Sequence, residues 1–345
     1  MIGVVSTSVL LIAYHGDQWI PDCLDTLADA STQPLHLVLV DNAGNTILDD
    51  LDLSPFDAEV LSTPRPMGFA EANNYALVKA SHLEDTVLFL NQDTLSGEGW
   101  LDQCRACFAR SPRLGAVSPV LRTFEWTDWD PDFLRFVRAA GQEERLREIE
   151  EEDGQNDEKQ WFKVKNAPAP ALLVRAKVLR EVGPFDPVFG SYCEDMDLCR
   201  RIRESGYDVG FCKRAEVAHY NGSTTTDRAK ERRRMRQILR NRILYQFREG
   251  KGPYGTKLAR RLIFDFPRRL ARGLVGTPSS QPPLVTIPAY ADLIGLGRRH
   301  LSRCADRNQW EAFLNEIDWP PSGTNLEAED AEASTAETTI HNTSE

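Results

Sequence analysis

Thr7-Ser-Val-Leu-Leu-Ile-Ala13 is an apolar run of strand length near the start of the chain. Leu35-His-Leu-Val-Leu-Val40 and Thr86-Val-Leu-Phe-Leu90 repeat the pattern further along. Continuous apolar runs of this kind are typical of strands that are buried on both faces of a sheet. Segments with helical periodicity lie between them, one around residues 19–27 and one at residues 70–80. This alternation predicts βαβ units and an α/β fold, in which a Rossmann-like, mostly parallel sheet is flanked by helices.

Shorter segments complete the predicted sheet and its helices. We expect strands at residues 59–62, 115–121 and 169–175, extended segments at 208–213 and 215–219, and helices after Gly99 and at 177–182. Residues 123–160 interrupt the alternation with Trp126, Trp129 and many acidic side chains, so we interpret them as an insertion. This insertion is either a flap over a binding site or a solvated excursion, and the sequence leaves both open.

The composition limits the class of protein. The chain has 345 residues, of which 41% are hydrophobic, and this suffices for a large core. No window approaches the roughly 18 uninterrupted apolar residues of a transmembrane helix. The N-terminal residues lack a positively charged region, so we expect a core strand there rather than a signal peptide. Seven cysteines are scattered along the chain, and the one close pair, Cys104 and Cys107, lies in a predicted helix without a second pair. This indicates reduced thiols, no zinc site and a cytoplasmic protein.

The net charge of −11 is unevenly distributed along the chain. Residues 228–272 contain 16 Lys and Arg against 3 Asp and Glu, whereas residues 143–158 and 326–345 are acidic. The basic segment is predicted to be helical, and it has three interpretations: a solvated helix face, peripheral contact with an anionic membrane, or nucleic-acid binding. We expect no nucleic-acid partner because the rest of the chain is acidic, and we favour contact with the inner face of the cell membrane.

These patterns divide the chain into three regions. Residues 1–226 form the α/β domain with its insertion at 123–160. Residues 227–319 form a basic helical C-terminal extension. Residues 320–345, rich in Ala, Thr and Glu, are expected to be a disordered acidic tail.

Polar residues follow the predicted strands where the strands end. Asp41 comes directly after the second apolar run, and Asn91 and Asp93 follow the third long run. In parallel sheets, ligands gather beyond the carboxyl ends of the strands. A further acidic group, Glu194, Asp195 and Asp197, falls where a loop enters a predicted helix. Taken alone, this group is explained by the favourable interaction of acids with the helix dipole.

Five ordered blocks of sequence resemble the family 2 nucleotide-sugar glycosyltransferases of the GT-A fold, especially their rhamnosyltransferase-like branch. The blocks are Leu11-Ile-Ala-Tyr-His-Gly16, Val40-Asp-Asn-Ala43, Gly68-Phe-Ala-Glu-Ala-Asn-Asn74, Leu90-Asn-Gln-Asp-Thr94, and Tyr192-Cys-Glu-Asp-Met-Asp-Leu198 with His219 downstream. Each block alone is a weak signal, but their order and spacing together are specific. The resemblance covers roughly residues 7–247.

The resemblance implies a divalent cation, Mn²⁺ or Mg²⁺, that offsets the charge developing on a nucleoside diphosphate. Asp93 would be its main protein ligand and His219 a second one. The sequence departs from the common Asp-x-Asp motif, because Asn91 stands at the first position. An amide oxygen is a poorer ligand than a carboxylate, so Asn91 would act through water or a sugar hydroxyl. A turn or capping role is the structural alternative for Asp93, and simple packing is the alternative for His219.

The resemblance also implies the residues that bind the nucleotide-sugar donor. Asp41 would accept a hydrogen bond from the nucleobase, with a turn role as its alternative. The other expected donor-binding residues are Ala13, Tyr14, Gly68, Asn73, Asn74, Asn91 and Gln92.

The acceptor hydroxyl loses its proton as it attacks, and a carboxylate suits the role of general base. By resemblance, Asp195 is this base and Glu194 orients the base or the acceptor. Asp197 is expected to cap the helix or to pair with Arg200 or Arg201. One displacement by the acceptor would invert the anomeric centre, through an oxocarbenium-like transition state.

The sequence therefore predicts an inverting, metal-dependent glycosyltransferase that moves a sugar, with rhamnose as a candidate, from a dTDP-, UDP- or GDP-sugar to a cell-surface or lipid-linked glycan. Two alternatives remain at this stage. One is a nucleotidyltransferase acting on sugar phosphates, although no basic Gly-rich loop follows the first strand. The other is a nucleotide- or glycan-binding module without catalysis.

Overall fold

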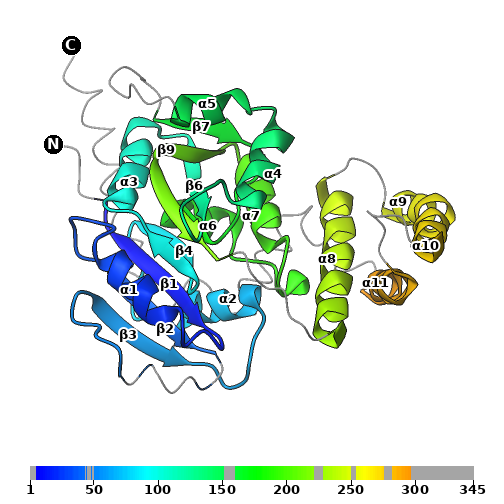
Figure 1. The fold of residues 1–345 in the computed structure, drawn as a ribbon, viewed down its shortest axis with the longest axis horizontal. Coiled ribbons are helices and arrows are strands. Elements are labelled where there is room, and N and C mark those ends of the chain that lie inside the picture. Colours follow the sequence, from blue (N-terminus) through cyan, green and yellow to red (C-terminus); the bar gives the residue numbers. More distant parts are fainter. Residues whose placement is uncertain are drawn as a thin grey trace, which may run out of the picture.

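The computed structural model describes residues 5–42, 44, 48, 50–150, 160–220, 228–249, 254–275 and 282–296. Within these ranges the strands form one sheet that helices flank, and further helices lie beyond it (Figure 1). The predicted acidic tail and residues 297–319 of the predicted extension lie outside the described residues. The strands are β1 (Thr7–Ala13), β2 (His36–Asp41), β3 (Asp57–Ser62), β4 (Thr86–Asn91), β5 (Thr94–Ser96), β6 (Leu114–Thr123), β7 (Trp161–Val164), β8 (Ala171–Arg175) and β9 (Asp208–His219).

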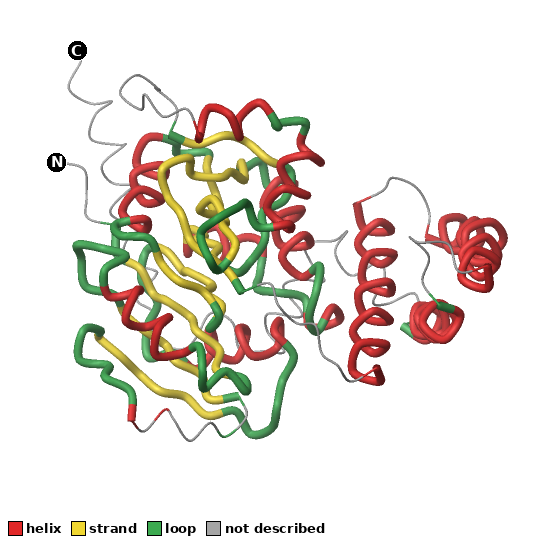
Figure 2. The backbone as a smooth tube through the Cα atoms, in the orientation of Figure 1, coloured by secondary structure: helices red, strands yellow, loops and turns green. Residues whose placement is uncertain are grey.

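The sheet order is β3-β2-β1-β4-β8-β6-β9-β5, and β7 pairs with β9. β1 is parallel to β2 and β4, β2 is parallel to β3, and β6 is parallel to β9. β8 is antiparallel to both β4 and β6, so β4 and β6 run in the same direction. Only the short β5, β7 and β8 run in the opposite direction, which confirms the mostly parallel sheet of the GT-A type. Figure 2 shows the strands of this sheet in yellow and the helices in red.

The helices connect the strands or pack beyond them. They are α1 (Ile20–Ala28), α2 (Phe69–Lys79), α3 (Trp100–Arg110), α4 (Pro131–Ala140), α5 (Glu144–Glu150), α6 (Ala176–Val182), α7 (Glu194–Glu204), α8 (Arg228–Glu249), α9 (Tyr254–Arg260), α10 (Phe266–Val275) and α11 (Pro283–Gly295), with a 3₁₀ turn η2 (Pro187–Phe189) and a π-helical turn η3 (Arg261–Asp265).

The apolar runs of the sequence form the centre of the core. Every residue of β1 is buried, and so is every residue of β2 and β4 except the last one. β3 lies at the edge of the sheet, and none of its residues is buried. The six described cysteines are buried with free thiols, in agreement with the expectation of reduced cysteines.

The C-terminal helices share a second hydrophobic cluster with the α/β domain. α8 lies between the sheet and the group α9–α11 (Figure 1). This cluster joins Phe189 and Cys193, next to α7, with residues of α8 and α11 such as Ile243 and Leu293. The division at residue 226 remains a prediction, but side chains on either side of it pack together.

Three details of the sheet differ from the expectation. The segments at 208–213 and 215–219 are one strand, β9, which follows β6 through an irregularity between Pro119 and Val120. β5 and β7 were not expected, and they contain only 3 and 4 residues.

No described helix combines the length and apolar character that crossing a bilayer requires.

Candidate active site

The carboxyl ends of the parallel strands bring most of the expected site residues to one edge of the sheet. Ala13 at the end of β1 pairs in register with Asp41 at the end of β2. β4 lies beside β1 and ends at Asn91, while β9 ends at His219 in the other half of the sheet. This edge is where open α/β sheets bind their ligands.

A side-chain amide ties the end of β1 to the turn after β4. The Tyr14 N–H donates to Gln92 Oε1 at 2.8 Å, and Gln92 Nε2 donates to the Tyr14 carbonyl at 2.8 Å. Gly16 lies against this amide, and a Cβ there would come within 2.2 Å of the Gln92 side chain. Gln92 therefore shapes the loop, and the Tyr14 ring, 47% exposed, remains open to a ligand.

The Asn42 side chain forms two hydrogen bonds in the turn after β2. The Asn42 amide is buried, donates to the Met67 carbonyl at 2.9 Å and accepts from the Met67 N–H at 2.8 Å. The Asp41 main-chain carbonyl accepts from the Thr63 N–H at 2.9 Å. The Asn42 side chain and the main chain of Asp41 therefore both hold this turn.

Gly68 allows the first turn of α2 to approach the loop that precedes α7. A Cβ on Gly68 would lie 3.2 Å from the main chain of Gly190. The Ala70 N–H donates to the Gly190 carbonyl at 2.8 Å, and the Phe69 N–H donates to Ser191 Oγ at 3.2 Å. The expected donor-side loop and the acceptor-side loop are thus bonded to each other.

The two asparagines of α2 differ in their surroundings. Asn74 donates to the Phe185 carbonyl at 2.7 Å and accepts from the Phe185 N–H at 3.0 Å, in a buried position. A buried amide used in this way holds main chain together, and the donor contact expected of Asn74 stays a prediction. Asn73 donates to the Phe69 carbonyl at 2.9 Å, and its buried Oδ1 has no hydrogen-bond partner.

Asp93 lies in the short turn between β4 and β5, beside the end of β9. β5 pairs with β9 so that Thr94 faces His219, and the Tyr220 N–H donates to the Asp93 carbonyl at 3.0 Å. Burial raises the pKa of Asp93, while the charge of His219 and a hydrogen bond from the Asn91 side chain offset part of the shift. Asp93 Oδ1 lies 3.7 Å from His219 Nε2, so the two expected metal ligands are neighbours.

His219 also contacts an acid from the insertion. Its Nδ1 lies 3.2 Å from Oδ2 of Asp130, which is fully buried. Burial alone would lower the pKa of His219, but the hydrogen bond to Asp130 and the charges of Asp93 and Asp130 outweigh it and raise the pKa. Burial would raise the pKa of Asp130, yet His219 and main-chain N–H groups hold it below its usual value.

The candidate base lies in the first turn of α7. Burial raises the pKa of Asp195 to about 6, against the hydrogen bond from the Met196 N–H and the charge of Arg135. Glu194 is buried beside it, and its Oε2 has no hydrogen-bond partner. Burial, together with the charge of Asp195, raises the pKa of Glu194 well above its usual range. A carboxylate that titrates near neutral pH suits general base catalysis.

The turn before α7 is strained, and a side chain of α8 holds it. Tyr192 and Cys193 have φ values of 71° and 69°, a left-handed conformation that is costly for residues other than glycine. Asn241 is fully buried, and its Nδ2 lies 2.7–2.8 Å from the carbonyl oxygens of Phe189, Ser191 and Tyr192. α8 thereby fixes the loop that positions Asp195.

Main chain between β7 and β8 connects the two halves of the site. The Asn91 N–H donates to the Pro170 carbonyl at 2.8 Å. The neighbouring main chain of Ala169 hydrogen-bonds to the Asp195 side chain. In addition, the charge of Asp132 acts on both Asp195 and His219. The expected acceptor and donor residues therefore border one region.

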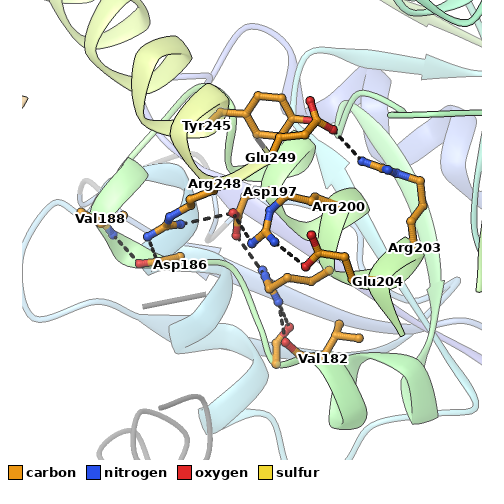
Figure 3. A network of polar contacts seen from close by, with 12 residues as sticks. Val182, Asp186, Val188, Asp197, Arg200, Arg203, Glu204, Tyr245, Arg248 and Glu249 are labelled. Atoms are coloured by element: carbon orange, nitrogen blue, oxygen red, sulfur yellow. Dashed lines mark hydrogen bonds and ion pairs between the residues drawn. The ribbon is translucent and has the colours of Figure 1, made fainter. Parts of the chain in front are cut away.

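Asp197 is structural, as predicted. It is fully buried and pairs with Arg201 at 2.9 Å. It also pairs with Arg200 at 3.1 Å and with Arg248 of α8 at 3.2 Å (Figure 3). Arg248 reaches Asp186 as well, at 2.7 Å. These ion pairs attach α8 to α7 inside the protein.

Sequence reasoning missed Asp130, Asn241 and Arg248. Asp130 had a usable signal, because Asp followed by Pro131 is typical of a helix start, and Asp130 does cap α4. Asn241 and Arg248 carried none, since they lie in a basic helix whose partners are distant in the sequence.

Comparison with known proteins assigns the class. The profile described as "Glycosyltransferase like family 2" matches residues 6–238, so the chain belongs to glycosyltransferase family 2. It is an enzyme that transfers a sugar from a nucleotide sugar. The nucleotidyltransferase and binding-module alternatives are therefore set aside.

The relatives are distant. The chain is 23% identical, over 63% of its own length and 76% of the relative's, to N-acetylglucosaminyl-diphospho-decaprenol L-rhamnosyltransferase of Mycobacterium tuberculosis. It is 28% identical to the pre-mycofactocin glycosyltransferase of the same species, over 55% of this chain and 38% of that one.

Two solved structures share the fold. One is a mannosyltransferase from Pyrobaculum calidifontis in complex with GDP-Man and Mn²⁺, with a TM-score of 0.53, 17% identity, and coverage of 91% of this chain and 87% of that one. The other is GalNAc-T7 with UDP, GalNAc and Mn²⁺, with a TM-score of 0.50, 15% identity, and coverage of 70% and 50%. The likeness confirms the GT-A fold.

The residues at the sheet edge fit a cation of limited protein coordination. Among the described residues, no group of three His, Cys, Asp or Glu side chains could form an all-protein metal site. Mg²⁺ commonly takes one or two carboxylates and completes its shell with water and substrate phosphates. Two ligand atoms at about 2.1 Å from one cation lie at most about 4.2 Å apart, and the Asp93–His219 separation of 3.7 Å meets this limit.

Proposed function

We propose that this glycosyltransferase is metal-dependent and inverting, and that it transfers rhamnose from a nucleoside-diphosphate donor to a hydroxyl of a lipid-linked or cell-surface glycan. The observation that carries the mechanism is the pairing of two sites at one sheet edge. Asp93 and His219 form the candidate metal pair, and Asp195 is a carboxylate with a raised pKa that bonds to the main chain of Ala169, next to the Pro170 carbonyl that binds Asn91. The similarity to the mycobacterial rhamnosyltransferase supports the choice of sugar and of acceptor.

In this proposal each residue has one task. Asp41 accepts a hydrogen bond from the nucleobase, and Tyr14, Gln92 and Gly68 shape the donor pocket. Asp93 and His219 hold Mn²⁺ or Mg²⁺, which when bound offsets negative charge on the departing diphosphate. Asn91 orients Asp93 through its hydrogen bond.

Asp195 takes the proton of the acceptor hydroxyl as that oxygen attacks the anomeric carbon. The bond to the diphosphate breaks in the same displacement, so the configuration inverts. Glu194, the pKa of which is raised by burial and by the charge of Asp195, hydrogen-bonds to the acceptor from the adjacent position.

The test measures nucleoside diphosphate release from dTDP-rhamnose and from a panel of other dTDP-, UDP- and GDP-sugars, with Mn²⁺, with Mg²⁺ and with a chelator. We expect metal-dependent turnover that Asp195→Asn reduces by about 10²–10⁴-fold while donor binding is retained. Turnover that survives the chelator would contradict the metal assignment. Turnover of a different sugar alone would replace rhamnose but leave the mechanism standing.

We also propose that the C-terminal helices contact an anionic membrane, at the cytoplasmic face where a lipid-linked acceptor would be presented. An apolar stripe faces outward on α11, with Leu284, Ile287 and Ile294 exposed by 72%, 50% and 56%. Arg268 and Arg272 are exposed on the neighbouring α10. Apolar side chains flanked by arginine suit the interface of an anionic bilayer.

The basic residues of α8 contribute less to this surface than the sequence indicated. Arg248 is buried in its ion pairs, and Arg240 donates to the Val188 carbonyl at 2.8 Å and the Phe189 carbonyl at 3.1 Å. Arg236 pairs with Asp292 of α11. These arginines bind protein groups, so the membrane proposal rests on α10 and α11.

Co-sedimentation with vesicles tests the surface. We expect the protein to bind phosphatidylglycerol-containing vesicles in low salt, and Ile287→Glu with Ile294→Glu to weaken this binding at least tenfold. The control is Val60→Glu, because Val60 is 49% exposed on β3 in the α/β domain. Equal binding by the double variant and the control would refute the proposed surface.

A further inference from the structure

We propose that Asp130, supplied by the 123–160 insertion, is a positioning residue that presents the Nε2 lone pair of His219 to the metal. The inference rests on the proposed metal role of Asp93 and His219. It adds a residue outside the five sequence blocks, and it gives the insertion a task inside the active site.

The two carboxylate oxygens of Asp130 face different partners. Oδ1 accepts from the main-chain N–H groups of Asp132 at 2.7 Å and Phe133 at 3.0 Å, which caps the start of α4. Oδ2 lies 3.2 Å from Nδ1 of His219. One carboxylate thus joins the first turn of the insertion helix to the end of β9.

The position of Asp130 is fixed by its surroundings. Its N–H donates to the Leu121 carbonyl of β6 at 2.9 Å. The preceding Trp129 is largely buried and forms a β-bridge with Arg122, whose guanidinium lies 3.7 Å from the centroid of the Trp129 ring. These contacts anchor the main chain of Asp130 on β6, and a rotation of its side chain away from His219 would break the capping hydrogen bonds of Oδ1.

The hydrogen bond decides which nitrogen of His219 carries the proton. An ionised carboxylate only accepts hydrogen bonds, so Nδ1 must donate to Oδ2. In the neutral ring, Nε2 then carries a lone pair, and Nε2 faces Asp93 at 3.7 Å. Histidines that bind metals are commonly oriented by a carboxylate on the other nitrogen, which fixes their tautomer.

Asp130→Asn reverses the polarity of this one hydrogen bond. The Asn carbonyl oxygen can still cap α4, because asparagine is a good N-cap residue. Its amide nitrogen, however, donates to Nδ1 and so forces the proton onto Nε2, which then cannot bind a cation. Asp132→Asn is the matched control, since it removes an equal charge two residues away and Asp132 pairs with Arg135 instead.

Two measurements test the inference. The first is ¹⁵N NMR of the His219 ring in the metal-free protein, at a pH where the ring is neutral; it requires no metal binding. We expect the Nδ1–H tautomer in the wild type and the Nε2–H tautomer in Asp130→Asn. An Nε2–H tautomer in the wild type would overturn the inference even if no variant can be folded.

The second is Mn²⁺ binding in the presence of dTDP, followed by electron paramagnetic resonance. We expect Asp130→Asn to weaken Mn²⁺ binding by about 10–100-fold, and Asp132→Asn to weaken it much less. Tight Mn²⁺ binding by the wild type and equally tight binding by Asp130→Asn would refute the role of Asp130 alone. If the wild type binds no Mn²⁺, the proposed metal site itself is wrong, and the tautomer measurement still reports on the hydrogen bond.

Discussion

Replacing Arg248 by Met should destabilise the protein strongly, because Arg248 is the buried ion-pair partner of two aspartates. Its side chain is 1% exposed and reaches Asp186 at 2.7 Å and Asp197 at 3.2 Å. Removing one partner of a buried ion pair typically costs about 3–5 kcal/mol, since a charge remains buried without its counter-ion.

The structure places this variant near the lower end of that range. Asp197 keeps its pairs with Arg200 and Arg201 after the substitution, and Asp186 keeps the Val188 N–H at 2.9 Å. The main loss is the Asp186 pair, so we expect the free energy of unfolding to fall by about 3 kcal/mol. Methionine retains most of the packing volume, which keeps the cavity contribution small.

Urea denaturation followed by circular dichroism measures the loss. The control is Arg236→Met on the same helix, whose pair with Asp292 is partly exposed and should be worth less than about 1 kcal/mol. A double-mutant cycle with Asp186→Asn isolates the pair itself. If the free energy of unfolding of Arg248→Met lies within 1 kcal/mol of the values for both the wild type and the control, the attachment of α8 does not depend on the ion pairs of Arg248.

Three further predictions follow from the same region. The kcat/KM should rise with pH around a midpoint near 6, because the pKa of Asp195 is about 6 and the base must be ionised. A flat pH profile of kcat/KM between pH 5 and 7 would exclude Asp195 as the general base. Burial would raise the pKa of Asp197, but Arg248, Arg201 and Arg200 hold this pKa well below its usual value. The contribution of Asp197 to stability is therefore complete above its unfolded pKa of about 3.9 and is lost as the pH falls further. Acid titration of the free energy of unfolding should show that Asp197→Asn removes this pH dependence. Asn241→Leu should lower kcat by about 100-fold while the donor KM stays unchanged, because a misplacement of about 1 Å in the strained turn suffices for such a loss; a change in donor KM alone would argue against this role.

The long elements of this fold were predictable because their sequence patterns are local. β1, β2 and β4 are continuous apolar runs, and the geometry of a parallel sheet then predicts that Asp41, Asn91 and His219 lie along the same edge. β5 and β7 were not predictable, since strands of three or four residues have no periodicity and form only when β9 offers them a partner.

The contacts in the site that the sequence did not predict have a common physical cause. Asn73 and Asn74 are adjacent in one helix, and only the fold reveals that the Asn74 amide, rather than that of Asn73, forms hydrogen bonds to the main chain of Phe185. Asp130 stands among exposed acids in the sequence, and its burial results from β6 and β9 lying side by side. Roles that depend on contacts between distant segments cannot be derived from a local pattern.

The hydrogen bonds from Asn241 to the turn before Asp195 have a consequence for the boundaries of the enzyme. A protein that ended at residue 226 would keep the proposed nucleobase, metal and base residues, but it would lose the three hydrogen bonds that hold carbonyl groups of the turn before Asp195. The smallest active unit should therefore extend through α8, so the C-terminal helices that begin with it are not a freely replaceable appendage. Exchange of these helices between relatives should preserve activity only when the turn at 189–193 is exchanged with them.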